Sequence, residues 1–143
     1  MADFGFAIYK GVDALKSYRG TMTYMAPEIK EGKTYKGTQV DLFSLGVILF
    51  IIVQGIFPFK EARREEYFYG LLMNGRIDHY WSKVNGGVLS QSFKDLVLGL
   101  FSYDGNQRPT TEQIRNSAWM QNPNYDKEAT RRTLIAELAR KKA

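Results

Sequence analysis

The sequence predicts a mainly α-helical fold, and three observations support this prediction. Apolar residues recur at helical spacing in several stretches, for example in residues 61–74. Runs of alternating apolar and polar residues, which indicate strands, are nearly absent. The 143 residues have the length of one ordinary domain, and 44% hydrophobic with 24% charged residues is typical of a soluble globular protein.

Turn and cap residues predict the first elements. Residues 6–25 are polar and contain glycine without a sustained period, so we expect a long loop there. A short helix is expected after Pro27, because proline suits a first helical turn, and Gly32 would end it. Thr38 is the expected N-cap of a long helix that reaches about Gln54.

This long helix includes the most apolar stretch of the chain. Residues 42–59 carry no charge over eighteen positions, which meets the lower length limit for a membrane-spanning helix. Polar residues, glycines and a proline interrupt the stretch, Asp41 precedes it, and lysines flank it on both sides, so no charge asymmetry sets an orientation. We therefore expect the central helix of a soluble core, ended by Gly55, and no membrane association.

The second half of the chain is predicted to continue with helices. Residues 61–74 carry apolar side chains at helical spacing, and Gly75 would close this helix. Residues 76–87 are predicted to form a loop, in which Tyr80 and Trp81 are packing anchors rather than a ligand site.

Two further helices are expected after this loop. Ser90 or Ser92 caps the first of them, and Thr110 or Thr111 starts the second, which ends near Trp119. A turn over residues 103–109, rich in Asp, Gly and Asn, separates the two. The apolar face of the first helix consists of Phe93, Leu96, Val97, Leu100 and Phe101.

Charge is unevenly placed along the chain. The net charge is +5, and residues 126–143 contribute +3 of it, from six Lys and Arg residues against three Asp and Glu residues. A solvated helix end accounts for this excess, so we do not expect nucleic-acid binding. We expect residues 1–121 to form one unit with a helical core over 38–121, and residues 122–143 to form a basic C-terminal helical tail.

The composition excludes several kinds of chemistry. The chain has no cysteine, which excludes disulfides, thiolate metal sites and cysteine nucleophiles. His79 is the single histidine, so a multi-histidine metal cluster is excluded as well. The first three residues lack the basic and apolar regions of a signal peptide, and we expect an intracellular, cytoplasmic protein.

Several short motifs occur in a fixed order. They are Asp3-Phe4-Gly5, Gly20-Thr21, Ala26-Pro27-Glu28, Asp41-Leu42-Phe43-Ser44-Leu45-Gly46-Val47, Pro58-Phe59 and Asn106-Gln107-Arg108-Pro109-Thr110. With these motifs the chain resembles a eukaryotic-type protein kinase over residues 1–121. The resemblance implies a partial protein-kinase-like fold, the C-terminal (large) lobe only, with an activation segment over residues 3–28.

The resemblance implies a function for the first triplet. Phosphoryl transfer depends on positioning and on charge neutralisation by magnesium, and Asp3 is the position that would bind this ion as a hard oxygen ligand. Phe4 would pack to set active or inactive states, and Gly5 would permit the backbone turn. ATP and Mg²⁺ are therefore the cofactors expected of the intact enzyme.

Hydroxyl residues of the activation segment carry further implications. Ser17 lies four residues before Thr21, where such kinases carry an activating phosphate, which can order a loop by pairing with arginines. Tyr18, Thr21 and Thr23 are hydroxyls too, and an unmodified loop stays open as the alternative. Thr21 resembles the threonine that contacts the catalytic aspartate, and Gly20-Thr21 favours transfer to Ser and Thr of protein substrates.

Three structural anchors follow from the resemblance. Glu28 and Arg108 resemble a pair that forms a buried salt bridge across eighty residues of sequence, and two solvated surface charges are the alternative. Asp41 would anchor the backbone of the catalytic loop.

The kinase group is indicated only by a short pattern. The run from Val47 to Phe59 is similar to the calmodulin-dependent and AMP-activated group, although Ile51 stands where many arginine-directed kinases have Glu. Calmodulin binding by the basic tail is not expected, because the tail lacks a bulky aromatic anchor past Tyr125.

The residues also lack several parts of a kinase. No Gly-rich loop, strand lysine, helix glutamate or catalytic-loop Asp and Asn is found in them. We expect the 143 residues alone to bind no cofactor tightly, to transfer no phosphate, and to expose apolar surface that a missing N-terminal kinase segment covers. The alternative is a non-catalytic, kinase-derived binding or scaffold module.

Overall fold

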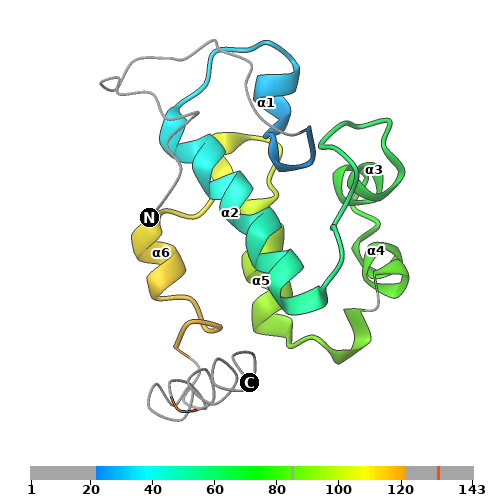
Figure 1. The fold of residues 1–143 in the computed structure, drawn as a ribbon, viewed down its shortest axis with the longest axis vertical. Coiled ribbons are helices and arrows are strands. Elements are labelled where there is room, and N and C mark those ends of the chain that lie inside the picture. The colour runs from blue at the N-terminus through cyan, green and yellow to red at the C-terminus, as the bar shows by residue number, and fades with distance from the viewer. Residues whose placement is uncertain (1–21, 85, 122–131, 133–143) are drawn as a thin grey trace, which may run out of the picture.

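The structure is a computed structural model that describes residues 22–84, 86–121 and 132, and these residues form helices and no strand (Figure 1). The predicted mainly α-helical class is confirmed. The elements are η1 (Met22–Tyr24), α1 (Pro27–Lys30), α2 (Gly37–Gln54), α3 (Tyr67–Met73), α4 (Ile77–Lys83), η2 (Gly86–Val88), α5 (Gln91–Leu100), η3 (Gly105–Gln107) and α6 (Thr111–Arg115).

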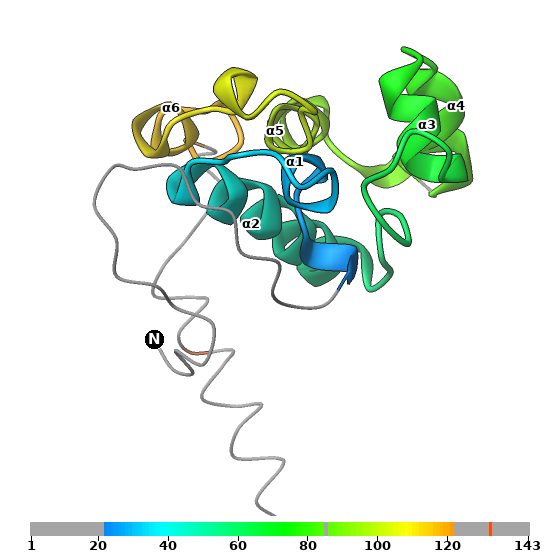
Figure 2. The ribbon, with the colours of Figure 1, turned by 90° about the horizontal axis from the view of Figure 1, so that it is seen from above.

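Helix α2 is the long central element, and α5 packs along it. The two views show α1 above one part of α2, α6 at one end of the molecule, and the α3–α4 pair at the other end (Figures 1 and 2). This arrangement places segments from all parts of the described chain around a single core.

The ends of α2 follow backbone conformation more than side-chain capping. Gly55 has φ 72° in the left-handed region, and its N–H bonds the carbonyl of Ile51, so the expected C-terminal stop is confirmed. Thr38 is not the N-cap, contrary to the prediction. Lys36 holds that position with extended backbone and no side-chain cap, because the chain enters the helix two residues earlier than Thr38.

Helix α3 is shorter than the predicted 61–74. It begins only at Tyr67, because Glu66 is the N-cap and its carboxylate accepts the N–H of Tyr69 at 2.8 Å. Residues 61–66 form turns instead of helix. The apolar spacing correctly predicted that a helix forms here, but the position of the acidic N-cap determines where it begins.

The predicted loop over residues 76–87 is wrong, because Ile77–Lys83 forms α4. Tyr80, Trp81 and Val84 are buried and lie on one side of it, with Ile77 partly buried against the core. They lie three, four and seven residues after Ile77, which is the spacing of one helix face. The segment is too short for this period to be recognised in the sequence. Tyr80 and Trp81 are packing residues, as predicted.

The caps of the last two helices follow the sequence. Ser90 caps α5 through its hydroxyl, which accepts the N–H of Phe93. Thr110 caps α6 in a reciprocal capping box with Gln113. Helix α6 ends at Arg115, before the predicted end near Trp119, and Trp119 packs edge to face on Phe93 at 5.5 Å.

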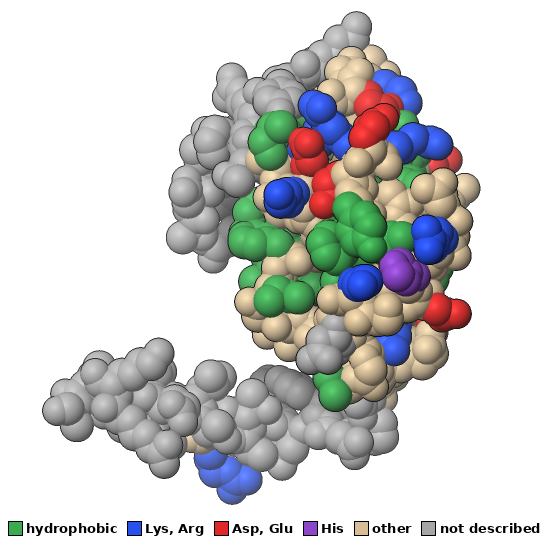
Figure 3. Space-filling view, turned by 90° about the vertical axis from the view of Figure 1, so that its right-hand side faces the viewer, with side chains coloured by type: hydrophobic (Ala, Val, Ile, Leu, Met, Phe, Trp, Pro, Cys, Tyr) green, Lys and Arg blue, Asp and Glu red, His purple; other side chains and the backbone are tan. Residues whose placement is uncertain are grey.

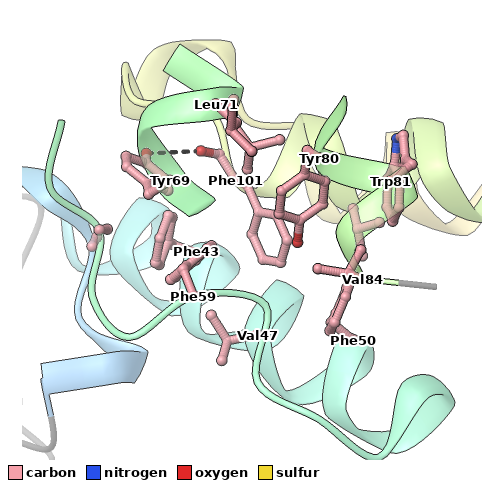
Figure 4. Packing of buried hydrophobic residues seen from close by; sticks show 14 of the residues in the cluster. Phe43, Val47, Phe50, Phe59, Tyr69, Leu71, Tyr80, Trp81, Val84 and Phe101 are labelled. Atoms are coloured by element: carbon pink, nitrogen blue, oxygen red, sulfur yellow. Dashed lines mark hydrogen bonds between the residues drawn. The ribbon is translucent and has the colours of Figure 1, made fainter. Parts of the chain in front are cut away.

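Aromatic side chains dominate the core (Figure 4). Phe101, which follows α5, is 2% exposed, and its ring centre lies 5.1–6.1 Å from three other rings: Phe43 and Phe50 of α2 and Phe59 of the loop after α2. Tyr69 of α3 packs on Phe59 and donates its hydroxyl proton to the carbonyl of Phe101 at 3.0 Å. One aromatic cluster thus joins α2, α3 and the end of α5.

Gly46 lets α2 and α5 approach closely. A Cβ atom added there would lie 2.7 Å from the Cβ of Leu100, which is fixed directly to the backbone of α5. We expect Gly46→Ala to lower the free energy of unfolding by up to about 2 kcal/mol, because overpacking outweighs the gain in helix propensity. Gly99→Ala is the control, since its Cβ meets Pro109 at an ordinary 3.4 Å. Urea unfolding measures both, and an unchanged Gly46→Ala midpoint contradicts the prediction.

Helix α2 is apolar on both sides, but only one side is covered by the described residues. Val40, Phe43, Val47 and Phe50 are buried. We define the α2 strip as the exposed apolar residues of and just after this helix, which are 42–74% exposed: Leu45, Ile48, Ile52, Val53, Ile56 and Phe57. Among the described residues, α2 is also the one helix whose length and composition would suit a membrane, with mean hydropathy 1.7 and 28% of its residues buried, which is weak evidence for a span.

Candidate functional site

Part of the predicted site lies outside the described residues. Asp3, Phe4, Gly5, Ser17 and Thr21 all fall in that part of the chain, so their roles stay predictions. The structure does describe the end of the predicted activation segment from Met22 onward, together with all three predicted anchors.

The structure brings Glu28 and Arg108 together across eighty residues of sequence. Arg108 donates from Nη1 and Nη2 to the two carboxylate oxygens of Glu28, at 2.7 and 2.8 Å. The side chain of Arg108 has no exposure and that of Glu28 has 14%. This is a buried bidentate pair between α1 and the turn after η3, not two solvated surface charges.

Arg108 also satisfies backbone groups around the pair. Its Nε donates to the carbonyl of Ser102 at 3.0 Å, and its Nη1 donates to the carbonyl of Gln39 at 2.8 Å. The guanidinium lies 5.0 Å from the ring centre of Phe43. One side chain therefore joins α1, the start of α2 and the turn after α5.

Ser44 of α2 fixes the residues just before α1. Its hydroxyl lies 2.8 Å from the carbonyl oxygen of Tyr24 and 3.1 Å from that of Val40, the residue four positions earlier in the helix. Met25 and Ala26, the next two residues in the chain, are buried. The sequence motif contained Ser44, but nothing in the sequence assigned this contact to it.

A second ion pair, which the sequence did not indicate, holds α1 to the residues after α2. Lys30 Nζ lies 2.8 Å from Glu61 Oε2, and the Lys30 side chain is 1% exposed. The hydrogen bond from Lys30 lowers the pKa of Glu61. Single charges thirty-one residues apart leave no local pattern in a sequence, so only the fold reveals the pair.

An aromatic hollow lies beside η1. We define it by its lining residues, Thr23, Phe57, Phe59, Lys60 and Phe68, which enclose about 220 Å³. Figure 3 shows apolar side chains in the middle of the α3–α4 face, with Lys and Arg side chains and the histidine around them. The hollow can receive an apolar side chain of another polypeptide, with Lys60 available to an acidic group.

Asp41 lies in α2, and its side chain makes no hydrogen bond or ion pair with any described residue. Desolvation by the atoms around it raises the pKa of its carboxyl group, although the residue stays exposed. A carboxylate without a partner is available to accept hydrogen bonds from another segment.

We expect Asp41→Asn to stabilise the protein at neutral pH. A raised carboxyl pKa means that the folded state binds this proton more tightly than the unfolded chain, so stability falls as pH rises through the folded value and stays lower above it. The gain is less than about 1 kcal/mol, because solvent screens an exposed charge. Thermal melts at pH 7 and pH 3 measure it; the gain should vanish at pH 3.

Asp78→Asn is the matched control for Asp41→Asn, because Asp78 is exposed in the first turn of α4, where a negative charge suits the helix dipole. We expect no stabilisation from it. A destabilising Asp41→Asn at pH 7 would contradict the inferred pKa direction.

The described residues contain no group of three or more His, Cys, Asp or Glu side chains that could hold a metal ion. What they contain is a set of anchors: the Glu28–Arg108 pair, the Lys30–Glu61 pair and the Ser44 hydroxyl join η1 and α1 to α2, to the loop after it and to the turn after η3. The arrangement thus presents the end of the predicted activation segment beside the aromatic hollow.

Comparison with known proteins identifies the class. The model of the protein kinase domain matches residues 1–120, and the chain belongs to this family. Two serine/threonine protein kinases are among its curated relatives. SIK1 of Rattus norvegicus is 36% identical over 126 residues, and DCLK3 of Mus musculus is 35% identical over 125 residues; each alignment covers 85% of this chain and 15% of the relative.

A plant relative is similar over a comparable share of the chain. The carbon catabolite-derepressing protein kinase of Secale cereale is 31% identical over 134 residues, with 87% of this chain and 24% of the relative covered. The chain therefore spans a quarter or less of the length of these three relatives. The predicted Ser/Thr kinase family and the C-terminal-lobe fold are confirmed.

Proposed function

We propose that these residues are part of a Ser/Thr protein kinase that, as an intact enzyme, transfers the γ-phosphate of ATP to Ser and Thr of protein substrates. The observation that carries the proposal is the buried Glu28–Arg108 pair, because it joins two of the ordered motifs. A buried charge pair of this kind restricts α1 to one position, and the predicted activation segment ends at α1.

Within this proposal the described helices dock the protein substrate. The aromatic hollow lies next to η1, and Phe57 packs edge to face on Tyr24 of η1 at 6.1 Å. A substrate chain that follows the activation segment would therefore meet a fixed apolar surface. Positioning of this kind supplies much of the catalytic effect in phosphoryl transfer.

The cofactor roles are proposed from the motifs. Asp3 would hold Mg²⁺, which neutralises phosphate charge when ATP is bound, with Phe4 and Gly5 setting the loop conformation. Thr21 would contact the catalytic aspartate, and Ser17 would carry the activating phosphate.

The α2 strip without Phe57, which lines the aromatic hollow, is the proposed contact with the N-terminal part of the kinase fold. Its residues are apolar and exposed at the centre of the molecule, including Ile52 at 74%. Asp41 on the same helix has a free carboxylate for the catalytic-loop backbone. An apolar surface of this kind on a soluble protein marks an interaction site. We propose an intracellular location, in keeping with this family.

The test has two arms. The genomic sequence upstream of the Met1 codon should encode, in frame, a glycine-rich loop and a catalytic-loop motif. The protein expressed from that longer frame should phosphorylate Ser or Thr of a mixed peptide library, and Asp3→Asn should abolish transfer while Asp78→Asn retains it. The 143 residues alone should bind ATP negligibly by calorimetry.

Two outcomes would overturn the proposal. If the upstream reading frame lacks these motifs and the protein expressed from it transfers no phosphate, the alternative of a non-catalytic binding or scaffold module is favoured. Transfer by the purified 143 residues that Asp3→Asn abolishes would contradict the need for the N-terminal part.

A further inference from the structure

Three charged side chains lie around the side chain of Tyr103, outside the anchors described above. Glu31 and Lys33 follow α1, Arg64 precedes α3, and Tyr103 lies in the turn after α5. Lys33 Nζ lies 5.4 Å from the centre of the Tyr103 ring, and the guanidinium carbon of Arg64 lies 4.7 Å from it. Two cations therefore lie beside one tyrosine ring.

A carboxylate already occupies the position next to the phenol. Tyr103 donates its hydroxyl proton to Glu31, and Lys33 forms an ion pair with the same carboxylate. Burial works to raise the pKa of Glu31, but hydrogen bonds from Lys33 and Tyr103 outweigh it, so the pKa is lowered. The Tyr103 hydroxyl thus lies beside a carboxylate that is paired with a lysine.

The Tyr103 side chain is within reach of another enzyme. It is partly exposed and lines a surface hollow of about 510 Å³, which Lys33 and Lys36 also line. Tyr69 and Tyr80 differ, since they are fully buried and donate their hydroxyl protons to backbone carbonyls. Of these three tyrosines, only Tyr103 can be modified without unfolding.

We propose that Tyr103 is a tyrosine phosphorylation site and that Lys33 and Arg64 bind its phosphate group. A separate tyrosine kinase with bound ATP would supply the group. The phenolic oxygen bonds to the γ-phosphorus, the bond from that phosphorus to the β–γ bridging oxygen breaks, ADP leaves, and the phenol proton passes to a base of that kinase. The new phosphate carries up to two negative charges.

The charges around Tyr103 determine what the phosphate does. Glu31 is repelled, so Lys33 exchanges the carboxylate for the phosphate, and Arg64 gains an anionic partner within reach of its guanidinium. Asp104 follows Tyr103 but is engaged with Asn106, whose backbone N–H it accepts at 2.9 Å. Phosphorylation therefore fastens the segment after α1 to the segment before α3. The inference does not rest on the proposed function.

The first experiment asks whether the folded protein is modified. The protein is incubated with a purified broad-specificity tyrosine kinase, ATP and Mg²⁺, and the sites are mapped by mass spectrometry. Tyr103 should be modified, Tyr69 and Tyr80 should not, and Tyr103→Phe should remove the corresponding phosphopeptide. If a synthetic peptide of residues 97–109 is phosphorylated while Tyr103 of the folded protein is not, the proposal is wrong.

The second experiment asks whether the two cations hold the phosphate. Phosphotyrosine is incorporated at position 103 by genetic code expansion, and its second ionisation is followed by ³¹P NMR. The midpoint should lie at least about 0.5 below that of the phosphorylated 97–109 peptide, because nearby cations favour the dianion. A midpoint equal to that of the peptide would refute the proposal.

Single substitutions show which side chains cause the shift of the phosphate ionisation midpoint. Lys33→Gln and Arg64→Gln should each raise the midpoint, and Glu31→Gln should lower it further by removing the competing carboxylate. Lys83→Gln is the control, because Lys83 is an exposed lysine of α4 that does not line the hollow. If Lys33→Gln and Arg64→Gln change the midpoint no more than Lys83→Gln does, Lys33 and Arg64 do not bind the phosphate and the proposal is wrong.

Discussion

Replacing Arg108 with Gln is expected to lower the free energy of unfolding by about 3–5 kcal/mol, because Glu28 is left buried without its partner. The same substitution removes the donors for the carbonyls of Ser102 and Gln39, which are part of the expected loss. Urea unfolding followed by circular dichroism measures the change. Such a loss approaches the whole stability of a typical domain.

Two control variants distinguish the contribution of the Glu28–Arg108 pair to stability from that of its surroundings. Arg115→Gln changes an exposed arginine of α6 and should alter stability by no more than about 0.5 kcal/mol. The double substitution Glu28→Gln with Arg108→Gln should cost less than the sum of the single changes, because only the single changes leave a buried charge without its partner. Additive losses would show that Glu28 and Arg108 do not interact in solution.

The second large effect is expected from Phe101→Ala, at about 3–5 kcal/mol. The ring is 2% exposed and contacts the rings of Phe43, Phe50 and Phe59, so its removal leaves a cavity bounded by α2 and the loop after it. Phe43 and Phe50 are fixed on the same helix, α2, which limits how far the site can collapse.

Phe57→Ala is the matched control, because Phe57 is also a phenylalanine but is 55% exposed. We expect it to change stability by about 1 kcal/mol or less. Thermal and urea unfolding of the two variants should therefore differ clearly. Equal losses from Phe101→Ala and Phe57→Ala would mean that the aromatic cluster is not the core in solution.

Local rules predicted the elements whose signals are local. The left-handed Gly55 ends α2, Ser90 caps α5, and Thr110 starts α6 as the pattern indicated, because each depends on a few neighbouring residues. The same rules missed α4 and misplaced the start of α3. There, burial of Tyr80 and Trp81 and the carboxylate cap of Glu66 decided the result.

The family and its ordered motifs were readable from the sequence alone, since a motif is a fixed set of residue types at a fixed spacing. The same reading implied that Glu28 and Arg108 would form a buried pair, but the sequence did not indicate the backbone carbonyls of Ser102 and Gln39 that Arg108 also bonds. Those contacts come from the start of α2 and the turn after α5, which lie far apart in the chain.

Tertiary structure alone decided the contacts that single side chains make with distant segments. Lys30 with Glu61, Ser44 with Tyr24, and the two cations beside Tyr103 leave no periodic trace, because each partner is one residue in an otherwise ordinary stretch. The sequence by itself determined the helical class, the kinase family and the apolar character of α2. Packing determined which face of α2 is buried, because only the fold brings α5 and the aromatic cluster against one side of it.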